Sequence, residues 1–190
     1  MTSGQDRIRG GRPPAPPARF AAVVLALAAA LVVAGCGQGA PVAPRTLSVT
    51  SEEFIQNLLP RQYTCHGNKI NPPLSWSGAP AGTKSFALVV DDASAPITPY
   101  IYWLVFDIGP GTTDIQEGSP PTGARQAMNS AGTASYDAPC PSGQPHMYRF
   151  TVYALNSWVS LPNGSPLPNV LAEIAAHTIG RGRKTVTGYP

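Results

Sequence analysis

The 190-residue chain carries 13 lysine and arginine residues against 10 aspartate and glutamate residues, a formal net charge of +3. Four of the basic residues and one acidic residue lie in the first 35 positions, so the remainder carries as many positive as negative side chains. A balanced domain of this kind has no electrostatic footprint for a phosphate backbone, and we expect no nucleic-acid partner.

The first 35 residues have the layout of a bacterial export signal. The apolar run FAAVVLALAAALVVAG, which ends immediately before Cys36, follows four arginines: Arg7, Arg9, Arg12 and Arg19. Basic residues, a short apolar run and small residues at the cut are typical of a secretory signal, whereas a membrane span usually needs about 20 apolar residues. The letters VAGC resemble the bacterial lipobox, whose cysteine is lipidated and becomes the new N-terminus. We therefore predict a signal peptide over residues 1–35 and a protein anchored by Cys36 to the extracytoplasmic face of the cell membrane; the alternative is an uncleaved anchor helix.

The rest of the chain is expected to form a tether over residues 36–44 and one domain over residues 45–190, which is long enough for a single hydrophobic core. Two cysteines remain there, Cys65 and Cys140. An even number outside the cytoplasm favours a disulfide, which would contribute about 4 kcal/mol by closing so long a loop. Two free structural thiols are an alternative. A nucleophilic pair of Cys140 and His146 is another, but it needs a third orienting group that the sequence does not identify.

The elements of this domain are mainly strands. Segments rich in β-branched and aromatic residues, bounded by Gly, Pro, Asn or Asp, predict strands over residues 46–51, 84–92, 100–108 and 147–155. The second and third are apolar almost throughout, which indicates central strands covered on both faces. One helix is predicted from Leu167 to Thr178 because apolar residues recur there at helical spacing, with Pro168 in the first turn and Gly180 just past the end. The fold class is therefore mainly β with a short C-terminal helix.

Four stretches of the domain resemble the phosphatidylethanolamine-binding protein family, in its bacterial Raf-kinase-inhibitor-like branch. They are RQYTCHGNKINPPLSWSGAPAGTKSFALVVDD, DDASAP, YWLVFDIGPG and APCPSGQPHMYRFTVYAL. The resemblance runs from about Leu47 to Tyr189. It implies an antiparallel Greek-key β-sandwich with a small, rigid pocket at one end that accepts phosphate-like anions and head groups.

The same resemblance implies which residues line that pocket, and it shows where this chain departs from the family. The family motif Asp-Pro-Asp-Ala-Pro is DASAP here, with Ala93 and Ser94 as replacements, and the first residue of a family His-Trp pair is a tyrosine. The implied ligand-binding residues are Asp92, Pro96, Tyr102, Pro139, His146 and Tyr148. Such a pocket relies on histidine, tyrosine and backbone donors rather than on lysine or arginine. With fewer titrating groups, we expect a pocket that keeps its shape but is weaker or retuned for anions.

A two-carboxylate hydrolase built on Asp91 and Asp92 is excluded, because adjacent strand residues point to opposite faces of a sheet. The leading expectation is a non-catalytic binding protein for a small anionic or phospholipid-head-group-like ligand, with no cofactor and no metal. One alternative is a protein-interaction module that inhibits a kinase or a protease. A more remote alternative is a hydrolase that uses His146, for which the sequence shows no nucleophile and base within one motif.

Overall fold

The computed structural model describes residues 45–95 and 97–190. The predicted signal peptide, the tether with Cys36, and Pro96 lie outside the described residues. Two clusters of buried apolar side chains belong to the described part of the chain. A segment with its own core can fold by itself. Among the described residues no helix is both long and apolar enough to cross a membrane.

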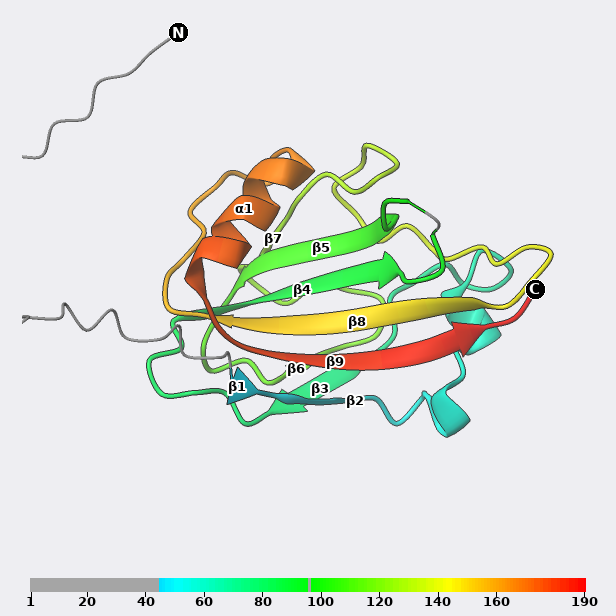
Figure 1. Ribbon diagram of the computed structural model, residues 1–190, viewed down its shortest axis with the longest axis horizontal. Helices are drawn as coiled ribbons and strands as arrows, with labels where there is room; N and C mark the ends of the chain where they lie inside the picture. Colours follow the sequence, from blue (N-terminus) through cyan, green and yellow to red (C-terminus); the bar gives the residue numbers. More distant parts are fainter. Residues whose placement is uncertain (1–44, 96) are drawn as a thin grey trace, which may run out of the picture. The chain divides into compact units, whose positions relative to one another are not determined.

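Nine strands form two sheets (Figure 1). The larger sheet has the spatial order β1 (Arg45–Thr46), β9 (Thr178–Gly188), β8 (His146–Leu155), β4 (Ser85–Asp92), β5 (Ile101–Ile108) and β7 (Arg125–Gln126). The smaller sheet has the order β2 (Ser48–Thr50), β3 (Leu74–Ser77) and β6 (Asp114–Ile115). Neighbouring strands are antiparallel, apart from β1, which runs parallel to β9. Two short 3₁₀ helices, η1 (Ile55–Asn57) and η2 (Arg61–Tyr63), follow β2. The mainly β sandwich predicted from the sequence is confirmed.

The main core lies between the two sheets. Trp76 of the smaller sheet meets Phe86 of the larger one edge to face, with ring centroids 5.5 Å apart. The other face of the larger sheet is covered by α1 (Leu167–His177), whose Val170 and Ile174 are buried in the second cluster with side chains of β4 and β5. Every residue of β4 is consequently buried, as the apolar run predicted.

Two features differ from the sequence-based expectation. The predicted strand over residues 46–51 is divided between the sheets at Leu47, because β1 pairs with β9 whereas β2 pairs with β3. The long strand β9 was not predicted, because its glycines and basic residues are poor strand formers. Its glycines have a packing reason: a methyl group on Gly182 would lie 2.2 Å from the carbonyl oxygen of Leu47.

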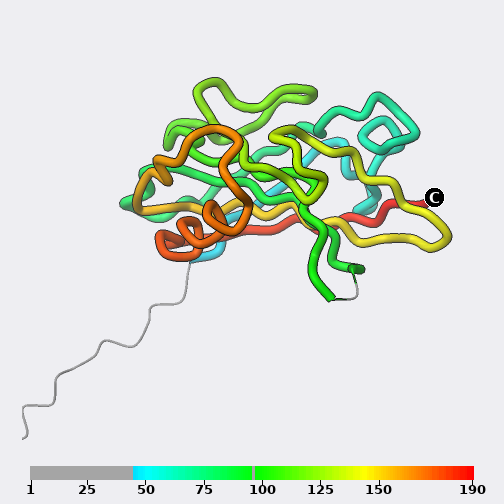
Figure 2. The backbone as a smooth tube through the Cα atoms, turned by 90° about the horizontal axis from the view of Figure 1, so that it is seen from above, coloured from blue at the N-terminus to red at the C-terminus, as the bar shows by residue number. Residues whose placement is uncertain are grey.

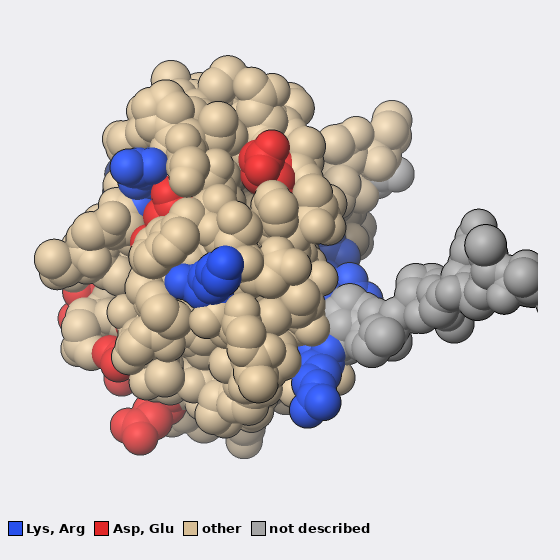
Figure 3. Space-filling view, turned by 90° about the vertical axis from the view of Figure 1, so that its left-hand side faces the viewer, with Lys and Arg blue, Asp and Glu red and all other residues tan. Residues whose placement is uncertain are grey.

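Charged side chains are sparse on the domain surface. On the face shown in Figure 3, lysine and arginine side chains stand singly among neutral ones and do not gather into a patch.

Candidate functional site

The strand register brings the last residue of β4 and the first residues of β8 to the same end of the larger sheet, called here the Asp92–His146 edge. Asp92, the last residue of β4, pairs with Tyr148, and β8 begins two residues earlier at His146. The His146 Nδ1 atom lies 2.7 Å from the Asp92 Oδ2 atom. The Asp92 carboxylate is buried, whereas 32% of the His146 side chain is exposed to solvent. The pair therefore combines a shielded negative charge with an accessible imidazole.

The loop that follows Asp92 is fastened back onto β8 (Figure 2 shows this β4–β5 connection projecting from the body of the domain). The second carboxylate oxygen of Asp92 accepts a hydrogen bond from the Ser94 backbone N–H at 2.7 Å. The Ser94 hydroxyl accepts one from the Met147 N–H at 2.9 Å, and the Ala93 N–H donates to the Met147 carbonyl at 2.8 Å. Ala93 and Ser94, the departures from the family motif, thus still join the two strands at this edge.

The Asp92 carboxylate determines what the other nitrogen of His146 can do. A carboxylate accepts only, so Nδ1 carries the proton that is donated to Asp92. In the neutral imidazole Nε2 is then an acceptor, and it becomes a donor when the ring is protonated. The pair can therefore present a charged N–H donor to an anion.

Two tyrosine rings pack beneath and beside this pair. The Tyr148 ring stacks near His146 at a centroid distance of 6.2 Å and meets the Tyr102 ring edge to face at 5.6 Å. Burial, together with the nearby charge of Asp92, raises the pKa of Tyr102 to about 12. Burial also raises the pKa of Tyr148. Both hydroxyls keep their protons near neutral pH and remain possible donors.

The Tyr148 hydroxyl is buried and makes no well-formed hydrogen bond within the protein, although the Tyr102 hydroxyl lies beside it. Among the described residues the other buried side-chain polar atom in this condition is Nε1 of Trp76, which belongs to the core between the sheets. Leaving a buried hydroxyl unpaired costs about 1–3 kcal/mol. Trp76 lies in the middle of the core, whereas Tyr148 lies at the Asp92–His146 edge. A ligand oxygen bound at this edge could accept a hydrogen bond from the Tyr148 hydroxyl.

Sequence reasoning missed two polar residues that brace this edge. The Tyr100 hydroxyl donates to the Asp137 carboxylate at 2.8 Å, and the Asp137 N–H donates to the Tyr102 carbonyl at 3.0 Å. Burial raises the pKa of Tyr100 to about 12. These bonds hold the start of the 137–141 segment against the start of β5. The spacing of Tyr100 and Tyr102 places them on one face of a strand, which is the signal that could have identified Tyr100.

Sequence reasoning also missed a glycine at this edge. Gly188, the partner of His146 on β9, leaves no room for a side chain, because a methyl group there would lie 2.6 Å from the Tyr148 ring. The Tyr148 ring therefore packs directly against the backbone of β9 at Gly188.

The disulfide between Cys65 and Cys140 is present, with the two Cα atoms 5.1 Å apart. The Cys65 N–H also donates to the carbonyl of the buried Pro139 at 2.9 Å. The pairing predicted from the sequence is confirmed, and the two alternatives, free thiols and a Cys140–His146 nucleophile, are wrong because both sulfurs are bonded to each other. His66 lies beside this disulfide, within 4.8 Å of both sulfurs; disulfide sulfurs are not thiolates, which are the ligands that metals bind.

The structure therefore brings together four of the six residues named from the sequence: Asp92, Tyr102, His146 and Tyr148. Pro139 lies in the adjoining segment, held by the Cys65 N–H and two residues after Asp137. Pro96 is outside the described residues. Asp91 points to the opposite face, where the Arg149 guanidinium binds its carboxylate through two nitrogens.

Comparison with known proteins agrees with this fold. The family model of the phosphatidylethanolamine-binding proteins matches residues 49–189. The chain belongs to this family. The crystal structure of YbcL from Escherichia coli, described as a member of the mammalian branch of the family, superposes with a TM-score of 0.70 at 30% identity, over 76% of this chain and 98% of that one.

Relatives within the family extend the comparison. A UPF0098 protein of Methanothermobacter thermautotrophicus is 38% identical over 130 residues, which cover 66% of this chain and 86% of the relative. A protein of Mycobacterium tuberculosis strain H37Rv is 37% identical over 144 residues, or 74% of this chain and 71% of that protein. The latter is named as a candidate lipoprotein, LppC.

Proposed function

We propose that this family member is a lipid-anchored, extracytoplasmic, non-catalytic protein that binds a small ligand through a phosphate or similar anionic group. The anchor is supported by the export-signal layout before Cys36 and by the similarity to the mycobacterial lipoprotein. The ligand class is supported by the chemistry of the Asp92–His146 edge.

The observation that carries the proposal is the buried, unpaired hydroxyl of Tyr148 next to an accessible, carboxylate-supported imidazole. A phosphate oxygen entering beside His146 would accept from the protonated Nε2, and a second oxygen would give the Tyr148 hydroxyl its missing partner. A hydrogen bond that involves a charge contributes about 1.5–3 kcal/mol. Tyr102, half-buried beside Tyr148, offers a third donor.

Binding without catalysis is favoured because the groups that a hydrolase would need are already engaged. The sulfur of Cys140 is in the disulfide, and both oxygens of Asp92 accept hydrogen bonds. The Ser94 hydroxyl accepts a hydrogen bond from the Met147 N–H at 2.9 Å. None of these groups is free to act as a nucleophile next to His146.

A second candidate function, a module that binds and inhibits another protein, has one observation in its favour. Ile97 follows Asp92 by five residues and is 93% exposed, and Met147 follows His146 directly and is 49% exposed. Apolar side chains at the rim of a polar site are suited to contact with a protein partner.

The ligand proposal is tested by titrating phosphoethanolamine and inorganic phosphate into residues 41–190, monitored by calorimetry. His146→Ala should weaken binding of both by about ten- to a hundredfold while leaving the melting temperature within a few degrees of the parent. His177→Ala, at the end of α1, is the matched control and should change nothing. Unaltered binding in the His146→Ala protein would refute the assignment, and binding of neither probe would favour the protein-partner function.

The anchor is tested separately in the full-length chain. Cys36→Ser should abolish lipidation and release the protein from the membrane fraction. Full retention on the membrane after a carbonate wash would contradict the lipobox interpretation and favour an uncleaved helix.

A further inference from the structure

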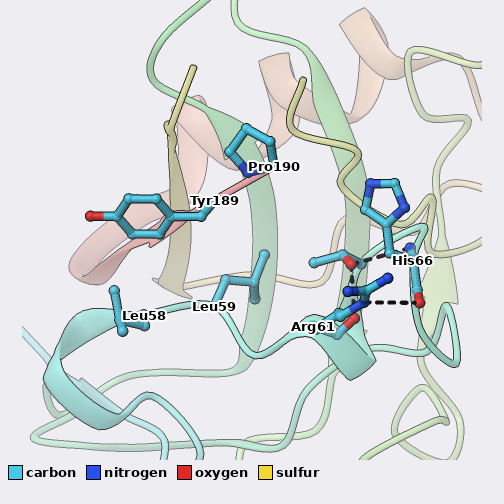
Figure 4. Close-up of a pocket in the computed structure, with 7 residues that line it drawn as sticks. Leu58, Leu59, Arg61, His66, Tyr189 and Pro190 are labelled. Atoms are coloured by element: carbon cyan, nitrogen blue, oxygen red, sulfur yellow. Dashed lines mark hydrogen bonds between the residues drawn. The ribbon is translucent and has the colours of Figure 1, made fainter. Parts of the chain in front are cut away.

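A cavity of about 300 Å³ opens between the segment that follows η1 and the residues that follow β9 (Figure 4). It shares no lining residue with the Asp92–His146 edge. Apolar groups line one side: Leu58, Leu59, Tyr189 and Pro190. Polar groups line the other: Arg61, Thr64 and His66. In Figure 4 the leucines lie across the cavity from His66, with the Arg61 guanidinium below the imidazole.

The walls of this cavity are held in place by bonds that do not depend on a ligand. The Leu59 N–H donates to the Thr187 carbonyl at 2.9 Å, which fastens the leucine wall to β9. The Thr64 hydroxyl donates to the Arg61 carbonyl at 2.8 Å, and the neighbouring Cys65 is fixed by the disulfide. A site that is already formed loses little conformational entropy when it is filled.

The polar side carries a positive charge without a negative partner. Among the ion pairs of the described residues none involves Arg61. Its Nε atom has a long contact, 3.5 Å, with the backbone carbonyl of His66. The guanidinium terminal nitrogens, which bind carboxylates in a two-pronged geometry, are therefore available.

The apolar side exposes surface that a folded domain ordinarily hides. Leu58 is 40% exposed and Tyr189 is 61% exposed, and both lie on the side of the cavity away from Arg61 and His66. An occupant that satisfies both sides has an apolar chain and one anionic end. A volume of about 300 Å³ is at the lower limit of small-molecule sites, which fits one short chain and excludes the paired chains of a phospholipid.

We propose that this cavity binds the carboxylate end of a short, single-chain fatty acid, with the carboxylate on Arg61 and the chain on Leu58, Leu59 and Tyr189. The site is independent of the phosphate site at Asp92 and His146, so either can fail without the other.

The test is a titration of ¹⁵N-labelled residues 41–190 with butyrate, hexanoate and octanoate, followed by amide chemical shifts. Shifts should be largest at Leu59, Thr64, His66 and Tyr189. Affinity should rise about fourfold for each methylene that enters the cavity. Shifts centred on Asp92 and Met147, or an affinity that does not change from butyrate to octanoate, would overturn the proposal.

Matched variants separate the charge from the apolar wall. Arg61→Gln should weaken octanoate by about tenfold, whereas Arg61→Lys should keep most of the affinity. Arg181→Gln removes the same charge near the other end of β9 and should leave octanoate binding unchanged, as should His146→Ala. Equal octanoate affinity in the Arg61→Gln and Arg181→Gln proteins would overturn the assignment of the carboxylate to Arg61.

Discussion

Two aspartates that are adjacent in the chain, Asp91 and Asp92, end up in opposite chemical situations. Asp91 faces the outer side of the sheet, where Arg149 binds it through two nitrogens. An arginine stays charged at any ordinary pH, so this pair has a single state. Asp92 faces the other side and is bonded to His146, which is partly exposed and has a second ring nitrogen. The proposed function therefore uses the carboxylate that orients an accessible imidazole, not the one that is bound by an arginine.

The largest expected effect concerns the disulfide, which supports only the Asp92 side of this comparison. Replacing both Cys65 and Cys140 with alanine should lower the free energy of unfolding by about 4 kcal/mol, because the unfolded chain regains the freedom of a long loop. Urea denaturation of the variant and the parent measures the change. The phosphate affinity should fall as well, since the 137–141 segment adjoins Tyr102. A variant as stable as its parent would show that the two loops are held without the covalent link.

The second prediction makes the same substitution at both aspartates. Asp91→Asn should cost about 2 kcal/mol of stability, because the half-buried Arg149 loses its charged acceptor, and should leave phosphate binding unchanged. Asp92→Asn should weaken phosphate binding by about tenfold, because the protonated form of His146 loses its negative neighbour. Calorimetry and urea denaturation of both variants give the comparison. Equal binding losses in the two would remove the distinction between the faces.

The third prediction concerns pH. In the proposed site a protonated imidazole would bind the anion better than a neutral one, so affinity should fall as the pH rises, by up to about tenfold per pH unit. Burial and the Asp92 charge raise the pKa of Tyr102 to about 12, so this tyrosine takes no part and the dependence should correspond to one proton. Sulfate is the probe, because its charge is constant over this range. A two-proton dependence, or one that persists in His146→Ala, would contradict the model.

The smallest expected effect is a gain in stability rather than a loss. Tyr148→Phe removes a buried hydroxyl that has no partner, so the protein should become more stable by about 1 kcal/mol, while phosphate binding weakens severalfold. Thermal denaturation and calorimetry on one sample measure both. A loss of stability would mean that the hydroxyl is already satisfied in the free protein.

The central strands of the larger sheet were predictable because their positions follow from the local pattern of apolar residues. The apolar runs that became β4 and β5, and the alternation from His146 through Tyr148 to Phe150, specify both strand positions and faces. The convergence of Asp92 with His146 followed from the family motifs and the two-residue period.

What could not be predicted depends on tertiary contacts between distant segments. β9 contains Gly180 and Gly182, which weaken any strand pattern and are explained only by the close approach of Leu47. The bond between Tyr100 and Asp137 joins residues 37 positions apart. The fatty-acid cavity is formed by residues 58–66 and 189–190, and nothing in either stretch alone indicates a cavity.

The parallel pairing of β1 with β9 determines at which end of the larger sheet Arg45 lies. Arg45 pairs with Gly180 near the start of β9, whereas His146 pairs with Gly188 at its end. Eight residues of extended strand span about 26 Å, and Figure 1 shows β1 and the C-terminus at opposite ends of the domain. In the proposed anchored protein, the chain would therefore enter the domain at the end away from the Asp92–His146 edge.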